Sequence, residues 1–157
     1  DKITKVFHNA MYDVCWIRSV TGKMIKGRIV DTMIAASVVD ENRFRYSLDA
    51  LSKDYLNDSK YKYDLQQKTI EWSGGTVKDP MTNMHKLPAS IVKEYAKQDV
   101  SLTLRLWKLF NKKIDEVLYT KPEDNEQKTC RKIFELETKL FLCLVDMKFK
   151  GVRIDVP

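Results

Sequence analysis

Two aspartates of this chain stand where ordinary packing would not place a carboxylate. Asp99 falls within a run of apolar residues at three- and four-residue steps, which is typical of one helical face: Val92, Tyr95, Ala96, Leu102, Leu106, Leu109 and Phe110. Asp13 shares a helical face with Trp16, Ile17 and Val20. Because a carboxylate among apolar neighbours is costly unless a cation, metal or donor meets it, the two aspartates predict a metal site.

The segments around these aspartates resemble a known family. Asn9-Ala10-Met11-Tyr12-Asp13 and Tyr95-Ala96-Lys97-Gln98-Asp99 are similar to the second and third motifs of DEDD-type 3′-to-5′ proofreading exonucleases, in the variant whose third motif begins with tyrosine. Asp31-Thr32-Met33 and Tyr46 to Leu51 resemble the exonuclease domain of family A DNA polymerases, the polymerase I group. Phe134 to Asp155 resembles the helix that leads from that domain into the polymerase domain.

The resemblance implies a catalytic role for three residues. Phosphodiester hydrolysis by this family uses two Mg²⁺ or Mn²⁺ ions, which prefer oxygen ligands and lie roughly 3.5 to 4 Å apart. Asp99 would bind the metal that activates water, and Asp13 would serve the second metal. Tyr95 lies one turn before Asp99 on the same helical face, so its hydroxyl can reach the attacking water.

The resemblance also implies substrate contacts and partners. Arg45 falls where the polymerase I group has an arginine that contacts the DNA single strand, and Asn9 and Tyr12 flank the same cleft. The expected partners are single-stranded DNA or a primer 3′ end, and the remainder of the same polymerase chain. Single strands are held by phosphate charges and aromatic faces, which suits these residue types.

The family's first motif is the main departure. That motif, Asp-x-Glu on the opening strand of the sheet, supplies two of the four metal-binding carboxylates, and no such strand precedes the second motif here. We therefore expect a piece of a longer polymerase that lacks the opening strands. The 157 residues alone are expected to be inactive, with Asp13 and Asp99 repelling each other in the absence of metal.

Composition is that of a globular domain. The formal charge of +6 permits binding to nucleic acid, and no apolar run reaches the length of a membrane span. Three widely separated cysteines predict neither a zinc site nor a disulfide framework. We expect a cytoplasmic location, in the host if a phage encodes the protein. Neither His8 nor His85 is expected to take part in chemistry.

The alternation of strands and helices predicts an α/β fold. The resemblance implies that this fold is of the ribonuclease H-like kind, with a mixed central sheet between helices and without its first strands. Residues 1–121 are expected to form a partial exonuclease domain, and residues 122–157 the helix and junction to the polymerase. Asn9, Asp31 and Ser47 are expected to cap helices. The expected elements are strands at 3–8 and 26–30, helices from 9 to 22, 31 to 38, 47 to 56, 89 to 117 and about 125 to 150, and a loop at 57–87 with a short strand at 69–72. The last helix is expected to bury Ile133, Leu140, Leu144 and Met147.

Other interpretations remain open at this stage. Asp13 is also explained as a first-turn aspartate favoured by the helix dipole. The domain as a whole could be a catalytically silent scaffold that packs against a polymerase, or a DEDD ribonuclease that trims structured RNA. The polymerase-like ending disfavours the ribonuclease, and the retention of Asp13, Tyr95 and Asp99 disfavours the scaffold.

Overall fold

A small parallel sheet organises the first part of the chain. The computed structural model describes residues 2–58, 62–73, 78, 81–120 and 127–154. Strand β1 (Lys5–Phe7) pairs in parallel with β2 (Ile29–Asp31), with Phe7 opposite Asp31. Helix α1 (Ala10–Thr21) connects the two strands, as a parallel pairing requires. The α/β class is therefore confirmed, as a helix-rich fold with a small sheet, and both strands are shorter than predicted.

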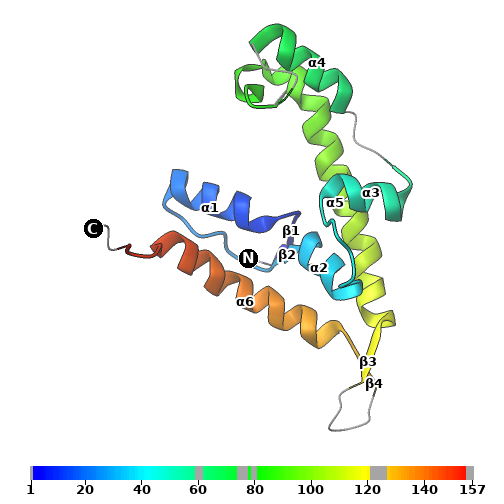
Figure 1. The fold of residues 1–157 in the computed structure, drawn as a ribbon. Coiled ribbons are helices and arrows are strands. Elements are labelled where there is room, and N and C mark those ends of the chain that lie inside the picture. Colours follow the sequence, from blue (N-terminus) through cyan, green and yellow to red (C-terminus); the bar gives the residue numbers. More distant parts are fainter. Residues whose placement is uncertain (1, 59–61, 74–77, 79–80, 121–126, 155–157) are drawn as a thin grey trace.

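Helices make up most of the remaining structure (Figure 1). They are α2 (Thr32–Val39), α3 (Leu48–Leu56), α4 (Lys62–Ser73), the short 3₁₀ helix η1 (Met84–Lys86), α5 (Ala89–Glu116) and α6 (Arg131–Lys150). An antiparallel hairpin, β3 (Leu118–Thr120) and β4 (Gln127–Thr129), joins α5 to α6. No helix in the described part of the chain is long and apolar enough to cross a membrane.

The Asp31 carboxylate accepts hydrogen bonds at the N-terminal ends of two helices, α1 and α2. Its Oδ1 accepts hydrogen bonds from the backbone N–H groups of Asn9 (3.0 Å) and Met33 (2.8 Å), and its Oδ2 accepts one from Ala10 (2.7 Å). The predicted cap of α2 is thus confirmed, and the same carboxylate also holds the start of α1. The prediction that the Asn9 side chain caps α1 is wrong: Asn9 has a left-handed backbone (φ 62°) and makes no side-chain cap bond. Asp31 holds the start of α1 through the N–H groups of Asn9 and Ala10, whereas an Asn9 cap would have reached the N–H of Met11 or Tyr12.

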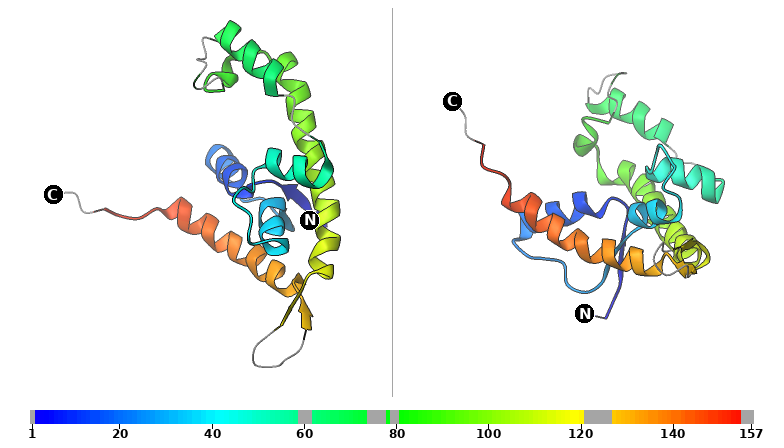
Figure 2. Two further views of the ribbon diagram at one scale, coloured as in Figure 1. Left: turned by 45° about the vertical axis from the view of Figure 1, so that its right-hand side comes forward. Right: turned by 60° about the horizontal axis from the view of Figure 1, so that its bottom comes forward.

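The main core lies where α2, α3 and α5 meet. Its largest fully buried members, all with less than 2% exposure, include Leu51, Leu102, Leu106 and Phe110. Ser47 begins α3 as predicted, since its Oγ accepts from the Ala50 N–H at 3.3 Å. Beyond the core, α5 continues away from the body, and α4 packs against its first half (Figures 1 and 2).

The predicted loop at 57–87 is wrong for its central part. Residues 62–73 form α4 in place of a loop with a short strand. The apolar pattern there is helical, because Leu65 and Thr69 lie one turn apart and are both buried. The Thr69 hydroxyl donates to the Leu65 carbonyl at 2.8 Å, which satisfies it within the helix. The β-forming tendency of residues 69–72 yields to packing against α5.

Helix α6 ends before Gly151 as predicted, but it begins at Arg131 and not near residue 125, because residues 127–129 form β4. Of its four residues predicted to be buried, Ile133 packs against the core, and the rest of the buried face is a different one. Phe134, Phe141 and Val145 are buried, whereas Leu140, Leu144 and Met147 are each more than 40% exposed. The helix carries two apolar faces, and the aromatic one packs on the rest of the molecule. The sequence pattern indicates two candidate faces and does not say which one is covered.

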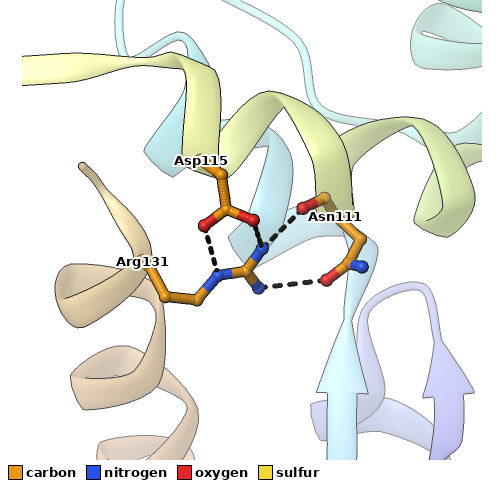
Figure 3. Close-up of polar contacts among 3 residues, drawn as sticks. All are labelled: Asn111, Asp115 and Arg131. Carbon is orange, nitrogen blue, oxygen red and sulfur yellow. Dashed lines mark hydrogen bonds and ion pairs between the residues drawn. The ribbon is translucent and has the colours of Figure 1, made fainter.

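Arg131 ties the start of α6 to the end of α5 (Figure 3). Its Nε and Nη2 donate to the two carboxylate oxygens of Asp115, at 2.8 and 2.5 Å. Its Nη1 and Nη2 also donate to the side chain and backbone oxygens of Asn111, at 3.0 and 2.5 Å. A planar guanidinium that makes four directed bonds sets the angle between the helices more firmly than a lysine could.

The Asp31 interaction generates a stability prediction. The two carboxylate oxygens of Asp31 together accept from three backbone N–H groups. Asparagine has only one side-chain oxygen, so at least one of these N–H groups would lose its acceptor. We expect the free energy of unfolding to fall by about 1–3 kcal/mol, measured by denaturant titration. Asp40→Asn is the matched control, because the Asp40 carboxylate accepts one exposed N–H, from Asn42 at 3.2 Å. Equal stability of the two variants would contradict the role given to Asp31.

Candidate active site

Asp13 and Asp99 line the same cavity, although they lie far apart in the sequence. The cavity has a volume of about 640 Å³ and lies between β1, α1, α3 and α5. Its other lining residues are Thr4, Val6, Phe7, His8, Leu48, Val100, Thr103 and Leu104. Two carboxylates therefore share one hollow with apolar walls, as a metal-dependent hydrolase requires.

Each aspartate is positioned by a different element. Asp13 lies in the first turn of α1, whose start is held by Asp31. Asp99 lies in α5, one turn before Thr103, which is buried. The prediction that Asp99 continues an apolar helical face is confirmed. The corresponding prediction for Asp13 is wrong, because Trp16, Ile17 and Val20 are 39–76% exposed.

The buried side of α1 is formed by other residues. Ala10 and Val14 are fully buried and pack with Phe141 and Val145 of α6. Asp13 directly precedes Val14 in the helix, so its side chain points about 100° away from that of Val14 and lines the cavity. Helix α1 therefore packs on the rest of the molecule through Ala10 and Val14, and its larger apolar side chains are exposed to solvent.

The pKa of Asp13 is raised above its ordinary value. Partial burial is the larger cause, and the negative charge of Asp31 is the second. Repulsion was expected from Asp99, whereas the aspartate that acts on Asp13 is Asp31. A cation in the cavity would oppose both effects, so the electrostatics of Asp13 fit a metal ligand.

The sequence did not predict that His8 would lie in the cavity lining, and no role in chemistry was expected of it. It lines the cavity beside Asp13 and Asp99. The Thr32 hydroxyl donates to the Phe7 carbonyl at 3.1 Å, so at 2.8 Å it accepts from His8 Nδ1. That arrangement fixes which ring nitrogen carries the proton and orients the imidazole. The available signal was its place directly after β1 and before the Asn9 motif.

Tyr95 lines a neighbouring cavity. That cavity, of about 780 Å³, lies between α4 and α5 and includes Gln98, Lys97 and Arg105. The structure therefore places Tyr95 one turn along α5 from Asp99, and in the lining of a different hollow from Asp13 and Asp99. The two hollows adjoin along α5, since neighbouring residues of one helix line them.

The expected substrate residues are all exposed, and the lining of the cavity that Asp13 and Asp99 share does not include them. Arg45 is exposed just before α3, whereas nearby Arg43 is paired with Asp54. Tyr12 is 60% exposed on the outer side of α1. Asn9 is exposed, and its backbone is fixed by Asp31.

The described residues do not by themselves form a metal site. Within the described ranges, no group of three or more His, Cys, Asp or Glu side chains could hold an ion. Asp13 and Asp99 provide oxygen ligands in one cavity, which fits Mg²⁺ or Mn²⁺ in chemistry but not in ligand number. One Asp-x-Glu triplet does occur, Asp124-Asn125-Glu126. It follows the third motif and lies outside the described residues.

The raised pKa of Asp13 generates a test of its environment. A carboxyl with a raised pKa binds protons more tightly in the folded chain, so its ionisation costs stability at neutral pH. We expect Asp13→Asn to raise the melting temperature at pH 7, with the gain disappearing as the pH falls below about 4, where ordinary aspartates are protonated. Thermal unfolding followed by circular dichroism between pH 3 and 7 measures this.

Asp115→Asn is the control of opposite sign. A hydrogen bond from Arg131 lowers the pKa of Asp115, so its carboxylate adds stability that is lost as the pH falls. We expect that substitution to lower the melting temperature at pH 7. An Asp13→Asn variant that behaved like Asp115→Asn would contradict the electrostatic account of the cavity.

Comparison with known proteins agrees with this geometry. A family model described as 3′-5′ exonuclease, of the DNA polymerase A group, matches residues 1–115. The DNA polymerase DpoZ of Acinetobacter phage SH-Ab 15497 is 30% identical over 152 residues, which cover 96% of this chain and 22% of that polymerase. The DpoZ of Salmonella phage PMBT28 is 28% identical over the same shares of both chains.

A bacterial relative extends the comparison. DNA polymerase I of Borreliella burgdorferi is 28% identical over 126 residues, which cover 80% of this chain and 11% of that polymerase. The chain thus spans about a fifth or less of the length of these relatives. With the family model matched over most of its length, the chain belongs to the 3′-5′ exonuclease family of family A DNA polymerases.

Proposed function

We propose that this chain is the proofreading exonuclease portion of a DNA-directed DNA polymerase. It would remove nucleotides from the 3′ end of single-stranded DNA. The observation that carries the proposal is the shared cavity of Asp13 and Asp99, which come from the second and third motifs of the family. The names of the relatives, all DNA polymerases, support a DNA substrate over a structured RNA.

The proposal includes the finer architecture. A ribonuclease H-like sheet would continue from the edge of β1, with residues 1–121 as a partial exonuclease domain and 122–157 as the junction to a polymerase. The parallel β1–α1–β2 unit and the family match over residues 1–115 support this division. Phage relatives support a site of action in the host cytoplasm.

The chain's own residues would each serve the reaction in a distinct way. Two divalent ions, when bound, would polarise the attacking water and stabilise the leaving oxygen. Asp13 and Asp99 would hold that charge in place at the cavity wall. The Tyr95 hydroxyl would orient the attacking water from one turn away, while Arg45, Asn9 and Tyr12 would hold the strand.

A silent scaffold is the second candidate. The observation that favours it is the lack of a three-ligand cluster among residues 2–58, 62–73, 78, 81–120 and 127–154. Mutation of the two aspartates separates the candidates, because a scaffold would tolerate their loss in every assay of the polymerase.

The first functional prediction applies to a polymerase that carries these residues behind a strand with Asp-x-Glu. We expect Asp99→Ala or Asp13→Ala to slow degradation of a labelled single strand by orders of magnitude and to leave nucleotide addition nearly intact, because the ligands serve hydrolysis alone. Gel analysis of primer ends measures both activities. If Asp99→Ala digests a primer as fast as the unmodified enzyme, the third motif is wrongly assigned.

Tyr95 provides a graded counterpart in the same protein. We expect Tyr95→Phe to lose part of the activity and to retain more than either aspartate variant. The substitution removes one hydrogen bond to the water and keeps every ligand and the ring. Single-turnover rates on the same substrate measure the difference, and a loss as large as that of Asp99→Ala would make Tyr95 more than a water-orienting residue.

The 157-residue chain by itself is expected to be inactive. Two carboxylates meet only part of the coordination that two Mg²⁺ ions require, so we expect no hydrolysis with Mg²⁺ or Mn²⁺. A labelled single strand is the substrate, and Asp99→Ala controls for contaminating nucleases. Degradation that needs both the metal and Asp99 would show that the described cavity is sufficient.

A further inference from the structure

We propose that the groove between α1 and α6 binds a base of the single-stranded DNA, on the 5′ side of the linkage that is cleaved. The inference rests on the proposed function. It adds a binding site to which Trp16, Phe149 and Lys148 contribute, and which none of the family motifs includes.

The groove is formed by two helices that lie side by side (Figures 1 and 2). It has a volume of about 400 Å³, within the roughly 300–1,000 Å³ of small-molecule sites. Its lining consists of Tyr12, Cys15, Trp16, Ser19, Lys148 and Phe149. Three of these six side chains are aromatic and one is cationic. The groove therefore combines flat apolar walls with one positive charge.

The aromatic side chains are unusually open to solvent. Tyr12 is 60% exposed, Trp16 is 55% exposed and Phe149 is 45% exposed. The rings of Tyr12 and Trp16 are tilted by 58° with centroids 6.4 Å apart, so they do not stack on each other. Contiguous exposed apolar surface of this kind marks a binding site more often than scattered single residues do.

Arg18 fixes the two walls relative to each other. From α1, its Nη1 donates to Asp146 Oδ1 of α6 at 2.5 Å. Its guanidinium carbon also lies 4.4 Å from the centroid of the Phe149 ring. The interaction holds Phe149 against α1, so the groove is formed before a ligand arrives and less ordering entropy is lost on binding.

The lining chemistry favours a nucleobase over an apolar side chain. Aromatic rings stack on any base, and a nearby cation meets the phosphate. The charged groups that face the groove are Lys148 on its wall and the paired Arg18 and Asp146 beside it. Lys150, in the same last turn of α6, adds positive charge at this end.

The position of the groove gives the polarity of the strand. Tyr12 lines the groove, and the next residue, Asp13, lines the catalytic cavity. A strand whose 3′-terminal linkage lies at Asp13 and Asp99 therefore has its preceding nucleotides within reach of Tyr12 and then Trp16. The stacked base is one of those preceding nucleotides.

The test is a double-mutant cycle between protein and DNA. Fluorescence anisotropy with a 5′-labelled oligothymidylate, in EDTA to prevent hydrolysis, gives the affinity of the 157-residue chain. We expect Trp16→Ala to weaken binding by about 5- to 150-fold, which corresponds to the roughly 1–3 kcal/mol of one base–aromatic stack. An abasic nucleotide at one position near the 3′ end should weaken the unmodified chain equally, and should have no added effect on Trp16→Ala.

Two variants control the result. Trp72→Ala removes the other strongly exposed tryptophan, 68% exposed on α4, and we expect unchanged affinity. Trp16→Phe keeps an aromatic face and should restore most of the binding. Circular dichroism shows whether each variant folds.

The outcomes separate this inference from the proposed function. If Trp16→Ala binds as tightly as the unmodified chain, the groove is not a base site, while the exonuclease proposal stands. If binding is lost but no abasic position reproduces the loss, the groove serves a protein contact and the inference is overturned. A chain that binds no single strand at all would overturn the groove inference, while the hydrolysis tests in the longer polymerase still decide the exonuclease proposal.

Discussion

One buried carboxylate fixes the geometry on which the site depends. Asp31 lies at the end of β2, opposite Phe7 of β1, and accepts three backbone hydrogen bonds that begin α1 and α2. The direction of α1, and with it the position of Asp13, follows from that contact. Burial raises the pKa of Asp13, and the negative charge of Asp31 raises it further, so the residue that orients α1 also makes Asp13 more costly to ionise.

Helix α5 extends from the main core to the cavity that Asp13 and Asp99 line. Its second half is buried through Leu106 and Phe110, and the same face continues to Thr103 and then to Asp99 at the cavity. Because a helix is stiff over this length, the packing of its buried end sets the position of the carboxylate near its middle. Arg131, the first residue of α6, donates to Asp115 near the end of α5 and so fixes the two helices against each other.

Sequence predicted what depends on local pattern and on family motifs. The helices with clear caps, such as α3 at Ser47 and α6 at Gly151, agree with the structure, because caps and periodicity are local properties. The predictions of a loop at residues 62–73, which form α4, and of the buried face of α6 were wrong. In both segments the apolar pattern is ambiguous, and the outcome depends on which neighbouring element covers it. The place of His8 in the cavity lining was not predicted for the same reason, because its ring is oriented by Thr32, a residue distant in the sequence.

Helix α1 shows how a short element serves three surfaces. Successive residues of a helix point about 100° apart, so Tyr12, Asp13 and Val14 face in three directions. Val14 is fully buried against α6, Asp13 lines the cavity that it shares with Asp99, and Tyr12 lines the groove. The apolar residues that suggested a buried Asp13 face outward instead, beside the path that a single strand would follow. Packing within the described part of the chain does not account for these exposed rings, and the base-binding groove proposed above would give them a partner.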